Sequence, residues 1–330
     1  MKACPKCEHN NDEDAKYCSV CGSSLKTSKN FLNNAYQGKN NWWIYLITIL
    51  STWGVQVLIG IVGGIVLVIF LIMQNGISTD FTSYLYNPFL LLPLTLVSFA
   101  ASYAIFYIFT RFIHKKKFIS FITTESKINW RRILKGAGLW LAILSIFTVI
   151  SILTNPGEFK FTFNLGAFGI LLIISLITFP IQASFEEVFF RGYLMQGIGL
   201  LSKKPIMPLL ATSILFALMH VLNGPNGTVS GFAVAETLII GLMFGVITLG
   251  ENSIETATGM HVINNIYASL IVSTQDSVLG NVPSVFTAPY DPYSSILWSF
   301  IVALIAITII FWGKKDKLLA IFKWKDAELN

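Results

Sequence analysis

The sequence predicts an all-α membrane protein with about eight transmembrane helices and a small zinc ribbon ahead of them. Three observations carry this prediction. Of the 330 residues, 54% are hydrophobic and only 12% are charged, whereas about 25% are charged in an ordinary soluble domain. Apolar runs long enough to cross a bilayer recur along the chain. All four cysteines lie within the first 21 residues.

The four cysteines form two Cys-x-x-Cys pairs, Cys4 with Cys7 and Cys18 with Cys21. Four thiolates at this spacing can close a tetrahedral shell, which is typical of a structural zinc site without an open catalytic position. Two disulfides are the alternative, and a cytoplasmic N-terminus disfavours them. We expect a zinc ribbon over residues 1–24, similar to the short ribbons of many bacterial membrane proteins.

Polar segments flank the apolar part of the chain. Residues 25–41 are rich in Ser, Asn and Lys and predict a flexible linker. The ribbon is therefore expected to dock a cytoplasmic protein partner or to regulate, not to join the active site. The apolar transmembrane domain is expected over residues 42–312. Residues 313–330 alternate apolar and basic positions, which predicts an amphipathic helix on the inner leaflet, with a plain polar tail as the alternative.

Eight apolar segments are candidate membrane spans, at residues 42–73, 88–113, 133–153, 165–190, 206–222, 229–249, 253–274 and 294–312. Lys and Arg cluster ahead of the first segment, after the second, after the fourth and after the eighth. The loops on the other side carry only Lys160. The positive-inside rule therefore predicts that both termini are cytoplasmic. Topology explains much of the net charge of +6, so the charge does not point to nucleic acid.

Three charged side chains interrupt the fourth segment: Glu186, Glu187 and Arg191. Each costs about 2.5–3.5 kcal/mol on insertion scales, so the chain is expected to use them. Glu187 and Arg191 are four residues apart and share a helix face, which predicts an ion pair. Glu186 points about 100° away and is left available as a general base or acid. A structural ion-pair network without catalysis is the alternative.

Two later segments each carry one histidine. His220 shares a helix face with Phe216, and His261 shares one with Asn265, with Asn264 close by. Residues 257–259, just before His261, are small and permit close helix approach. Taken alone, each histidine could simply hydrogen-bond between helices.

Glu-Glu-x-x-x-Arg, Phe-x-x-x-His and His-x-x-x-Asn, in this order on successive apolar segments, resemble the motifs of the CAAX protease and bacteriocin-processing (Abi) family of intramembrane proteases. The resemblance covers about residues 130–275. It implies peptide-bond hydrolysis within the membrane, on membrane-associated or lipidated peptides. It also implies that Glu186 activates water and that His220, His261 and Asn265 complete the polar cluster. Bacterial relatives are linked to bacteriocin immunity and peptide maturation, and the two-pair cysteine ribbon is in line with a bacterial plasma membrane.

The resemblance leaves two chemical schemes open. In the first, Glu186, His220 and His261 hold a catalytic zinc whose open position carries water. In the second, Glu186 with His220 polarises water directly, while His261 and Asn265 stabilise the oxyanion.

Two rival functions remain at this stage. One is a non-catalytic membrane scaffold that regulates a partner such as a sensor kinase, although this chain keeps every motif residue. The other is a proton-coupled transporter that uses the buried charges as a relay. The sequence shows no internal repeat, which weakens the transporter interpretation.

The predicted spans contain one inconsistency of depth. They place Glu186 near the cytoplasmic end of its span and His220 toward the outer end of the next, although one active site requires a common depth. We expect a cavity open to the cytoplasm.

The remaining titratable residues are given structural or solvated roles. Glu236 is expected to be hydrogen-bonded, Glu255 to lie at the membrane interface, and His114 and His9 to be solvated.

Overall fold

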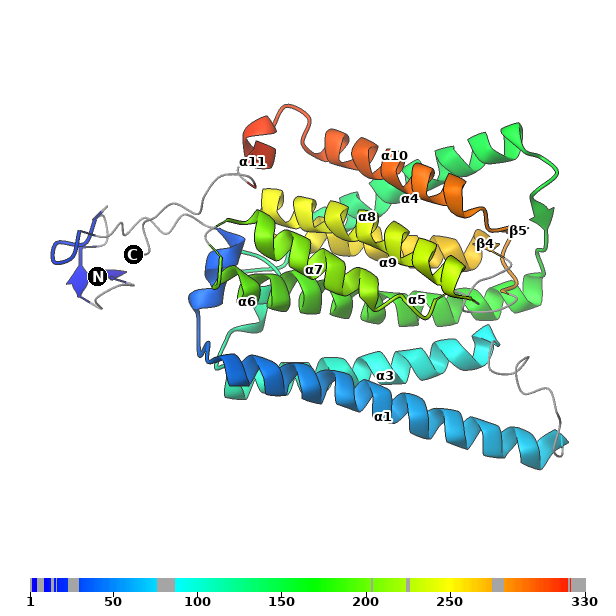
Figure 1. The fold of residues 1–330 in the computed structure, drawn as a ribbon, viewed down its shortest axis with the longest axis horizontal. Helices are drawn as coiled ribbons and strands as arrows, with labels where there is room; N and C mark the ends of the chain where they lie inside the picture. Colours follow the sequence, from blue (N-terminus) through cyan, green and yellow to red (C-terminus); the bar gives the residue numbers. More distant parts are fainter. Residues whose placement is uncertain are drawn as a thin grey trace.

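The computed structural model describes residues 2–4, 9–12, 15, 17–22, 30–75, 87–202, 204–223, 226–274, 282–319 and 321. Helices dominate these residues and run along the long axis of the molecule (Figure 1). They are α1 (Trp42–Asn75), α3 (Pro88–Ile108), α4 (Trp130–Thr154), α5 (Leu165–Glu187), α6 (Met195–Gly199), α7 (Ile206–Leu218), α8 (Gly227–Glu251), α9 (Glu255–Leu270), α10 (Pro292–Ile310) and α11 (Lys315–Leu319).

Short 3-10 and π-helical segments and small strands complete the described structure. They are the 3-10 helices η1 (Phe31–Tyr36) and η3 (Phe118–Phe121), the π-helices η2 (Phe109–Ile113) and η4 (Val188–Leu194), and the strands β1 (Lys2–Ala3), β2 (Asn10–Asn11), β3 (Lys160–Phe161), β4 (Val272–Thr274) and β5 (Phe286–Ala288). The β1 and β2 strands are antiparallel. A second sheet has the order β3-β5-β4, with β5 antiparallel to β3 and parallel to β4.

The all-α membrane fold is confirmed, but the predicted count of eight spans is not. Six helices in the described part of the chain are long and apolar enough to cross a bilayer. The other two predicted spans are shorter helices, because α7 has 13 residues and α9 has 16. At 1.5 Å per residue they reach about 20 and 24 Å, short of a hydrocarbon core about 30 Å thick.

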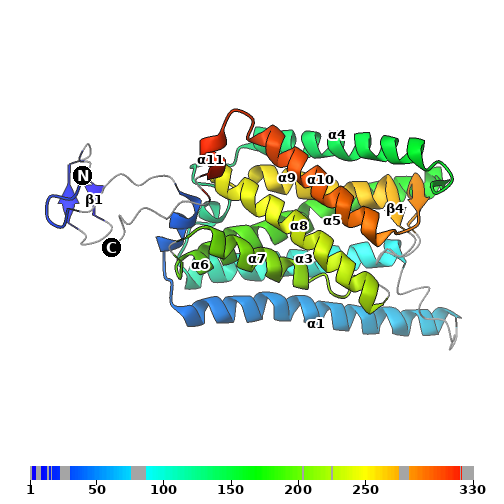
Figure 2. The ribbon, with the colours of Figure 1, turned by 45° about the horizontal axis from the view of Figure 1, so that its top comes forward.

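The short helices α7 and α9 lie among the longer ones. Figures 1 and 2 show α1 on one side of the bundle and α4 with α10 on the opposite side, with α5, α7, α8 and α9 between them. Gly136 of α4 and Gly259 of α9 allow these two helices to approach closely. A Cβ on Gly259 would lie 2.0 Å from the Ile133 carbonyl oxygen. The small residues before His261 therefore have the packing role that the sequence predicts.

The fourth span is longer than predicted, which removes the inconsistency of depth. Helices α5, η4 and α6 form one span from Leu165 to Gly199, whereas the sequence predicted an end at residue 190. Glu186 lies 13 residues before Gly199 (199 − 186), and His220 lies 14 residues after Ile206 (220 − 206). Both are therefore about 20 Å of helix rise from the turn that joins α6 to α7.

The segment before α1 is packed against the membrane domain over its described part, unlike the flexible linker expected for residues 25–41. Phe31, Leu32 and Ala35 are buried. The Phe31 backbone N–H donates to Asn252 Oδ1 at 2.8 Å. Apolar side chains thus hold residues 30–37 in place, although the polar composition alone predicts a mobile segment. The rest of the predicted linker before them, residues 25–29, lies outside the described residues.

Aromatic rings fill the core beside η4. Phe106, Phe121, Phe185, Phe189 and Tyr193 are buried and meet at ring-centroid distances of 5.2–6.2 Å. Rings at such distances gain edge-to-face contacts in addition to the area they bury. This packing fixes the helix that carries the two glutamates.

Candidate active site

Glu187 and Arg191 form the ion pair that their spacing predicts. Arg191 Nη1 donates to Glu187 Oε1 at 2.8 Å, and both side chains are fully buried. Arg191 Nη2 also donates to the Gly241 carbonyl oxygen of α8 at 3.2 Å. The pair lies where α5 passes into the π-helix η4, and π-helical turns are frequent at functional sites.

The same carboxylate oxygen binds a histidine from a distant helix. His261 Nδ1 lies 2.9 Å from Glu187 Oε1. Because a carboxylate only accepts, Nδ1 carries the proton of this hydrogen bond. Nε2 of the same ring faces Glu186 Oε2 at 3.5 Å. Glu187 and Arg191 therefore set both the position and the tautomer of His261.

Glu186 has a second neighbour on its own helix. Gln182, one turn earlier, donates through Nε2 to Glu186 Oε1 at 3.3 Å. Oε1 is thus held by an amide, while Oε2 faces His261. Sequence reasoning missed Gln182, although its i, i+4 spacing to Glu186 was available as a signal.

Two phenylalanines enclose the charged groups. The Arg191 guanidinium carbon lies 4.2 Å from the centre of the Phe216 ring. The Phe244 ring stacks on the His261 imidazole at 5.3 Å. These rings exclude water and add cation–π attraction, so the charges interact in a medium of low dielectric constant. We call Glu186, Glu187, Arg191 and His261 the glutamate cluster.

His220 lies beside the glutamate cluster without contacting it directly. Its ring is 4.9 Å from the Phe216 ring, which is itself 5.8 Å from the His261 ring. Its Nδ1 lies 2.9 Å from the Phe216 carbonyl oxygen, so Nδ1 is the protonated nitrogen and Nε2 keeps its lone pair. The imidazole that faces Glu186 directly is that of His261.

Asn265, one turn after His261, belongs to a chain of hydrogen bonds with a fixed direction. Trp140 Nε1 donates to Asn264 Oδ1 at 3.2 Å, and Asn264 Nδ2 donates to Asn265 Oδ1 at 3.3 Å. An indole N–H can only donate, so it fixes the orientation of both amides. Asn265 is left with its Nδ2 group as a donor that has no partner among the described residues. Trp140 was not identified from the sequence.

The membrane residues do not gather as a three-ligand metal site in this arrangement. Among the described residues, the donor atoms of Cys4, Cys18 and Cys21 form the group of three that lies within 4.8 Å. The donor atoms of Glu186, His220 and His261 do not form such a group of three, although Glu186 Oε2 and His261 Nε2 are 3.5 Å apart. This arrangement therefore supports no chemical step through a metal.

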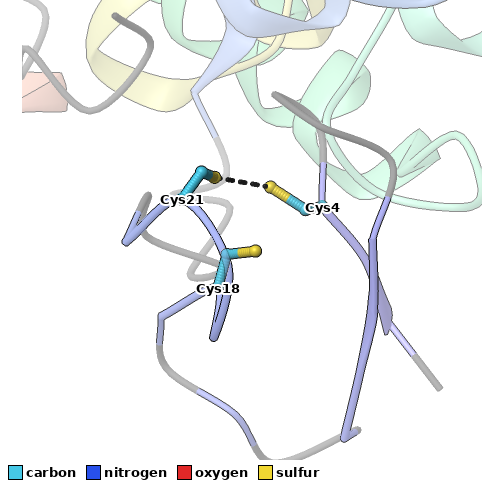
Figure 3. A group of neighbouring side chains, drawn as sticks. All are labelled: Cys4, Cys18 and Cys21. Atoms are coloured by element: carbon cyan, nitrogen blue, oxygen red, sulfur yellow. Dashed lines mark hydrogen bonds between the residues drawn. The ribbon is translucent and has the colours of Figure 1, made fainter.

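The N-terminal cysteines do fit a structural zinc. Cys4, Cys18 and Cys21 point toward one another (Figure 3), and the Sγ atoms of Cys4 and Cys21 are 3.5 Å apart. Three convergent thiols suit the tetrahedral sulfur shell of zinc. Cys7, the expected fourth ligand, lies outside the described residues, and His9 is exposed.

The prediction that His114 is solvated is wrong, because the histidine is 1% exposed. His114 Nε2 is 2.9 Å from the Tyr193 hydroxyl, and Lys116 Nζ donates to Gln196 Oε1 at 2.8 Å. The basic sequence around them favours a solvated loop, but Tyr193 and Gln196 offer partners in the interior. We call His114, Lys116, Tyr193 and Gln196 the lysine cluster.

Glu236 and Glu255 each have a structural partner. Tyr290 donates its hydroxyl to Glu236 Oε1 at 2.6 Å, in line with the hydrogen-bonded role expected for Glu236. Glu255 is buried, accepts from the Asn129 backbone N–H at 2.6 Å and lies 3.4 Å from Arg132 Nη1. Neither carboxylate contacts the glutamate cluster in the described structure.

Comparison with known proteins identifies both parts of the chain. Residues 168–267 match the model of the Rce1-like type II CAAX prenyl endopeptidases, and residues 4–25 match a zinc-ribbon domain. The uncharacterized protein YyaK of Bacillus subtilis (strain 168) is 32% identical over 286 residues, which are 85% of this chain and 95% of YyaK. No solved structure matches the chain. The expected resemblance is confirmed: the chain belongs to the Rce1-like CAAX endopeptidase family of intramembrane proteases and carries an N-terminal zinc-ribbon domain.

Proposed function

We propose that the chain hydrolyses a peptide bond of a membrane-associated or lipidated peptide, with Glu186 as the general base. One observation carries this proposal. Glu187 Oε1 binds both Arg191 and His261, at 2.8 and 2.9 Å, and so turns His261 Nε2 toward Glu186 Oε2. A carboxylate in a buried site, with an imidazole nitrogen 3.5 Å from one of its oxygens, can act as general base toward a water molecule beside it.

In this mechanism Glu186 takes one proton from the water, and the hydroxide oxygen attacks the carbonyl carbon of the substrate. The carbonyl oxygen becomes an oxyanion. When the tetrahedral intermediate collapses, the C–N bond breaks and Glu186 returns its proton to the leaving amine. The products are a carboxylic acid, which keeps the second proton of the water until it is released to solvent, and an amine; Glu186 is regenerated as a carboxylate. The protein supplies proton transfer and a fixed, low-dielectric environment.

Asn265 is the proposed donor to the oxyanion. Its Oδ1 accepts from Asn264, which leaves the two N–H groups of Nδ2 for the substrate. Preorganised donors of this kind are worth about 10²–10³ in kcat. His220 Nε2, with its lone pair outward, is the proposed second acceptor for the water when the substrate closes the site.

The proposed substrates follow from the chemistry of the family. Its description names prenyl endopeptidases, which supports a peptide with a lipid anchor as the substrate class. Bacteriocin immunity or peptide maturation is the proposed setting. A bacterial plasma membrane with both termini in the cytoplasm is the proposed location, because the basic loops favour that orientation.

The decisive experiment compares two Glu→Gln variants in membrane-spanning helices. The purified chain is reconstituted in liposomes with a library of lipidated peptides, and cleavage is followed by mass spectrometry. We expect Glu186→Gln to lower kcat by about 10²–10⁴, the range of general base catalysis. Glu236→Gln, whose carboxylate bonds Tyr290 outside the cluster, should keep the wild-type rate. Wild-type cleavage by Glu186→Gln would refute the proposed base.

A chelator separates the two chemical schemes, provided that the ribbon cannot contribute. Cleavage by a Cys18→Ser/Cys21→Ser variant is measured with and without a zinc chelator. The metal-free scheme predicts no change in rate on chelation. A rate that falls on chelation and returns with added zinc would assign the membrane site to a metal instead.

A further inference from the structure

The loop between α3 and α4 contains a second site, which is lined mainly by lysines and shares no residue with the glutamate cluster. A cavity of about 550 Å³ opens there, and its lining includes Lys115, Lys116 and Lys117 of this loop. Asn34 and Gln37, from η1 and the residue after it, also line the cavity. The site therefore lies between the segment that follows the zinc ribbon and the basic loop of the membrane domain.

We call this cavity the lysine pocket, and the charge of its lining is predominantly positive. Glu125 is the one carboxylate among the lining residues, against three lysines. Lys115 and Lys117 are exposed, whereas Lys116 is 3% exposed. Lys116 Nζ is bonded to the neutral Gln196 and lies 4.4 Å from the centre of the Phe121 ring. Within the described residues no carboxylate forms an ion pair with Lys116, so its amine is held here without a bound counter-charge.

Hydrogen bonds to backbone carbonyl oxygens hold the walls of the pocket together. Asn34 Nδ2 donates to the Ser120 carbonyl oxygen at 2.8 Å, and the Lys39 backbone N–H donates to the His114 carbonyl oxygen at 2.7 Å. Gly38 has φ +74° and lies so close to His114 that a Cβ would come within 2.3 Å of its carbonyl oxygen. The cavity is thus formed before any ligand arrives, which lowers the entropic cost of binding.

The pocket lies at the level of lipid headgroups. The second span ends at Ile113 and the third begins at Trp130, so Lys115 follows the apolar segment by two residues. Phe112 and Trp130 flank the loop and are each 66% exposed. Exposed aromatic residues of this kind mark the boundary between hydrocarbon and headgroups.

We propose that the lysine pocket binds the phosphate group of an anionic phospholipid headgroup. Basic pockets at this depth attract acidic headgroups, and the cavity is large enough for a headgroup with its glycerol. The acyl chains would extend past Phe112 into the bilayer. The bound lipid would contact both Asn34 and the lysines, and so would join the segment behind the zinc ribbon to the membrane domain. This proposal uses no residue of the glutamate cluster and stands independently of the proposed reaction.

The test counts lipids on the full-length protein by native mass spectrometry. Wild-type protein is compared with Lys115→Gln/Lys117→Gln and with a charge-matched control, Lys315→Gln/Lys317→Gln, in α11. Both pairs remove two exposed lysines, so neither should prevent folding. The probes are phosphatidylglycerol, phosphatidylcholine and inorganic phosphate.

We expect one phosphatidylglycerol to stay bound to the wild type and to the α11 control, with no equivalent phosphatidylcholine. The pocket variant should bind phosphatidylglycerol about 10- to 30-fold more weakly, because each lysine near the headgroups contributes about 1 kcal/mol. Equal losses in the two variants would show general surface attraction and refute the pocket. Binding of inorganic phosphate in place of lipid would also refute the lipid as occupant and assign the pocket to a soluble phosphate.

Discussion

One helical stretch, residues 165–199, contributes to two buried polar clusters that compensate charge in different ways. In the glutamate cluster, Glu187 meets the opposite charge of Arg191 at 2.8 Å. In the lysine cluster, Lys116 meets the neutral amide of Gln196 at the same distance. Both clusters use side chains of this helical stretch, and the charged side chains of both are almost completely buried. The two clusters therefore differ in the partners of those side chains.

The comparison separates two ways of tolerating a buried charge. Burial costs several kcal/mol per ion even after the protein relaxes. Glu187 and Arg191 offset this cost with each other and keep their charges. Lys116 has no such partner in the described structure, and desolvation by burial lowers its pKa from 10.5 to about 7. A fixed pair suits a site that must hold a geometry, while a group that titrates near neutral pH can respond to its surroundings.

The largest effect on stability is expected from breaking the ion pair between Glu187 and Arg191. Glu187→Gln leaves Arg191 buried without its counter-charge, which should lower the free energy of unfolding by about 3–5 kcal/mol. It should also release His261 and abolish cleavage. Thermal unfolding in detergent and the peptide cleavage assay measure the two effects.

A double variant separates stability from function at this pair. Glu187→Gln/Arg191→Met removes both charges, so it should regain most of the stability that Glu187→Gln loses. It should not regain cleavage, because His261 remains without its anchor. A double variant as unstable as the single one would contradict the charge argument.

The second prediction concerns pH and Lys116. Between about pH 7 and 10 the unfolded chain keeps the lysine proton while the folded chain releases it, so the unfolding free energy should rise with pH. The rise is about 2 kcal/mol between pH 7 and pH 9, from at most 1.4 kcal/mol per unit. Below about pH 6 both states are protonated and this contribution is constant.

Lys116→Met should remove that rise, and Lys117→Met, at an exposed position, should retain it. Chemical unfolding at pH 7 and pH 9, in a zwitterionic detergent without anionic lipid, measures the difference. Parallel pH profiles for the wild type and Lys116→Met would show that Lys116 does not titrate in this range.

A third prediction tests the directed hydrogen bonds that lead to Asn265. Trp140→Phe removes the indole donor and keeps a ring, and should lower kcat about five-fold, equivalent to one hydrogen bond of about 1 kcal/mol. Asn264→Leu should cause a similar loss, and the two changes together should cost little more than either alone. Trp298→Phe, at a partly exposed tryptophan packed on Phe147, is the control. If the losses of kcat in the two single variants added up in the double variant, the two residues would not act through one chain of hydrogen bonds.

The smallest effect is expected in the lysine cluster, from Tyr193→Phe. The change leaves His114 Nε2 without the hydroxyl at 2.9 Å, which should cost about 1 kcal/mol of stability. Cleavage at saturating substrate should be unchanged. A loss of kcat larger than the loss of folded protein would connect the two clusters functionally.

The sequence could predict those contacts of the site that join residues one helical turn apart. Glu187 and Arg191 are one turn apart, so their pairing follows from helix geometry alone. The contact between Glu187 and His261 joins residues 74 positions apart, and no spacing rule specifies it. The same limit applies to Trp140, whose indole meets Asn264 from another helix.

Hydropathy misplaced features where polar residues are buried. The fourth span was predicted to end at residue 190, yet the polar residues Arg191 and Gln196 beyond that end are completely buried. His114 was expected to be solvated because it lies in a basic sequence, yet it is 1% exposed. Composition measures what a side chain prefers on average, whereas tertiary partners decide whether it can be buried.

The two bonds made by Glu187 Oε1 also set an order of events during synthesis. The bond to Arg191 is local and can form while this helix enters the membrane, when the charges are most costly. The bond to His261 must wait until 74 further residues have been made. Until then Glu186 has no imidazole beside it. A chain synthesised only as far as this helix thus lacks the imidazole of the proposed site, so hydrolysis by the proposed mechanism must wait until α9 has been made.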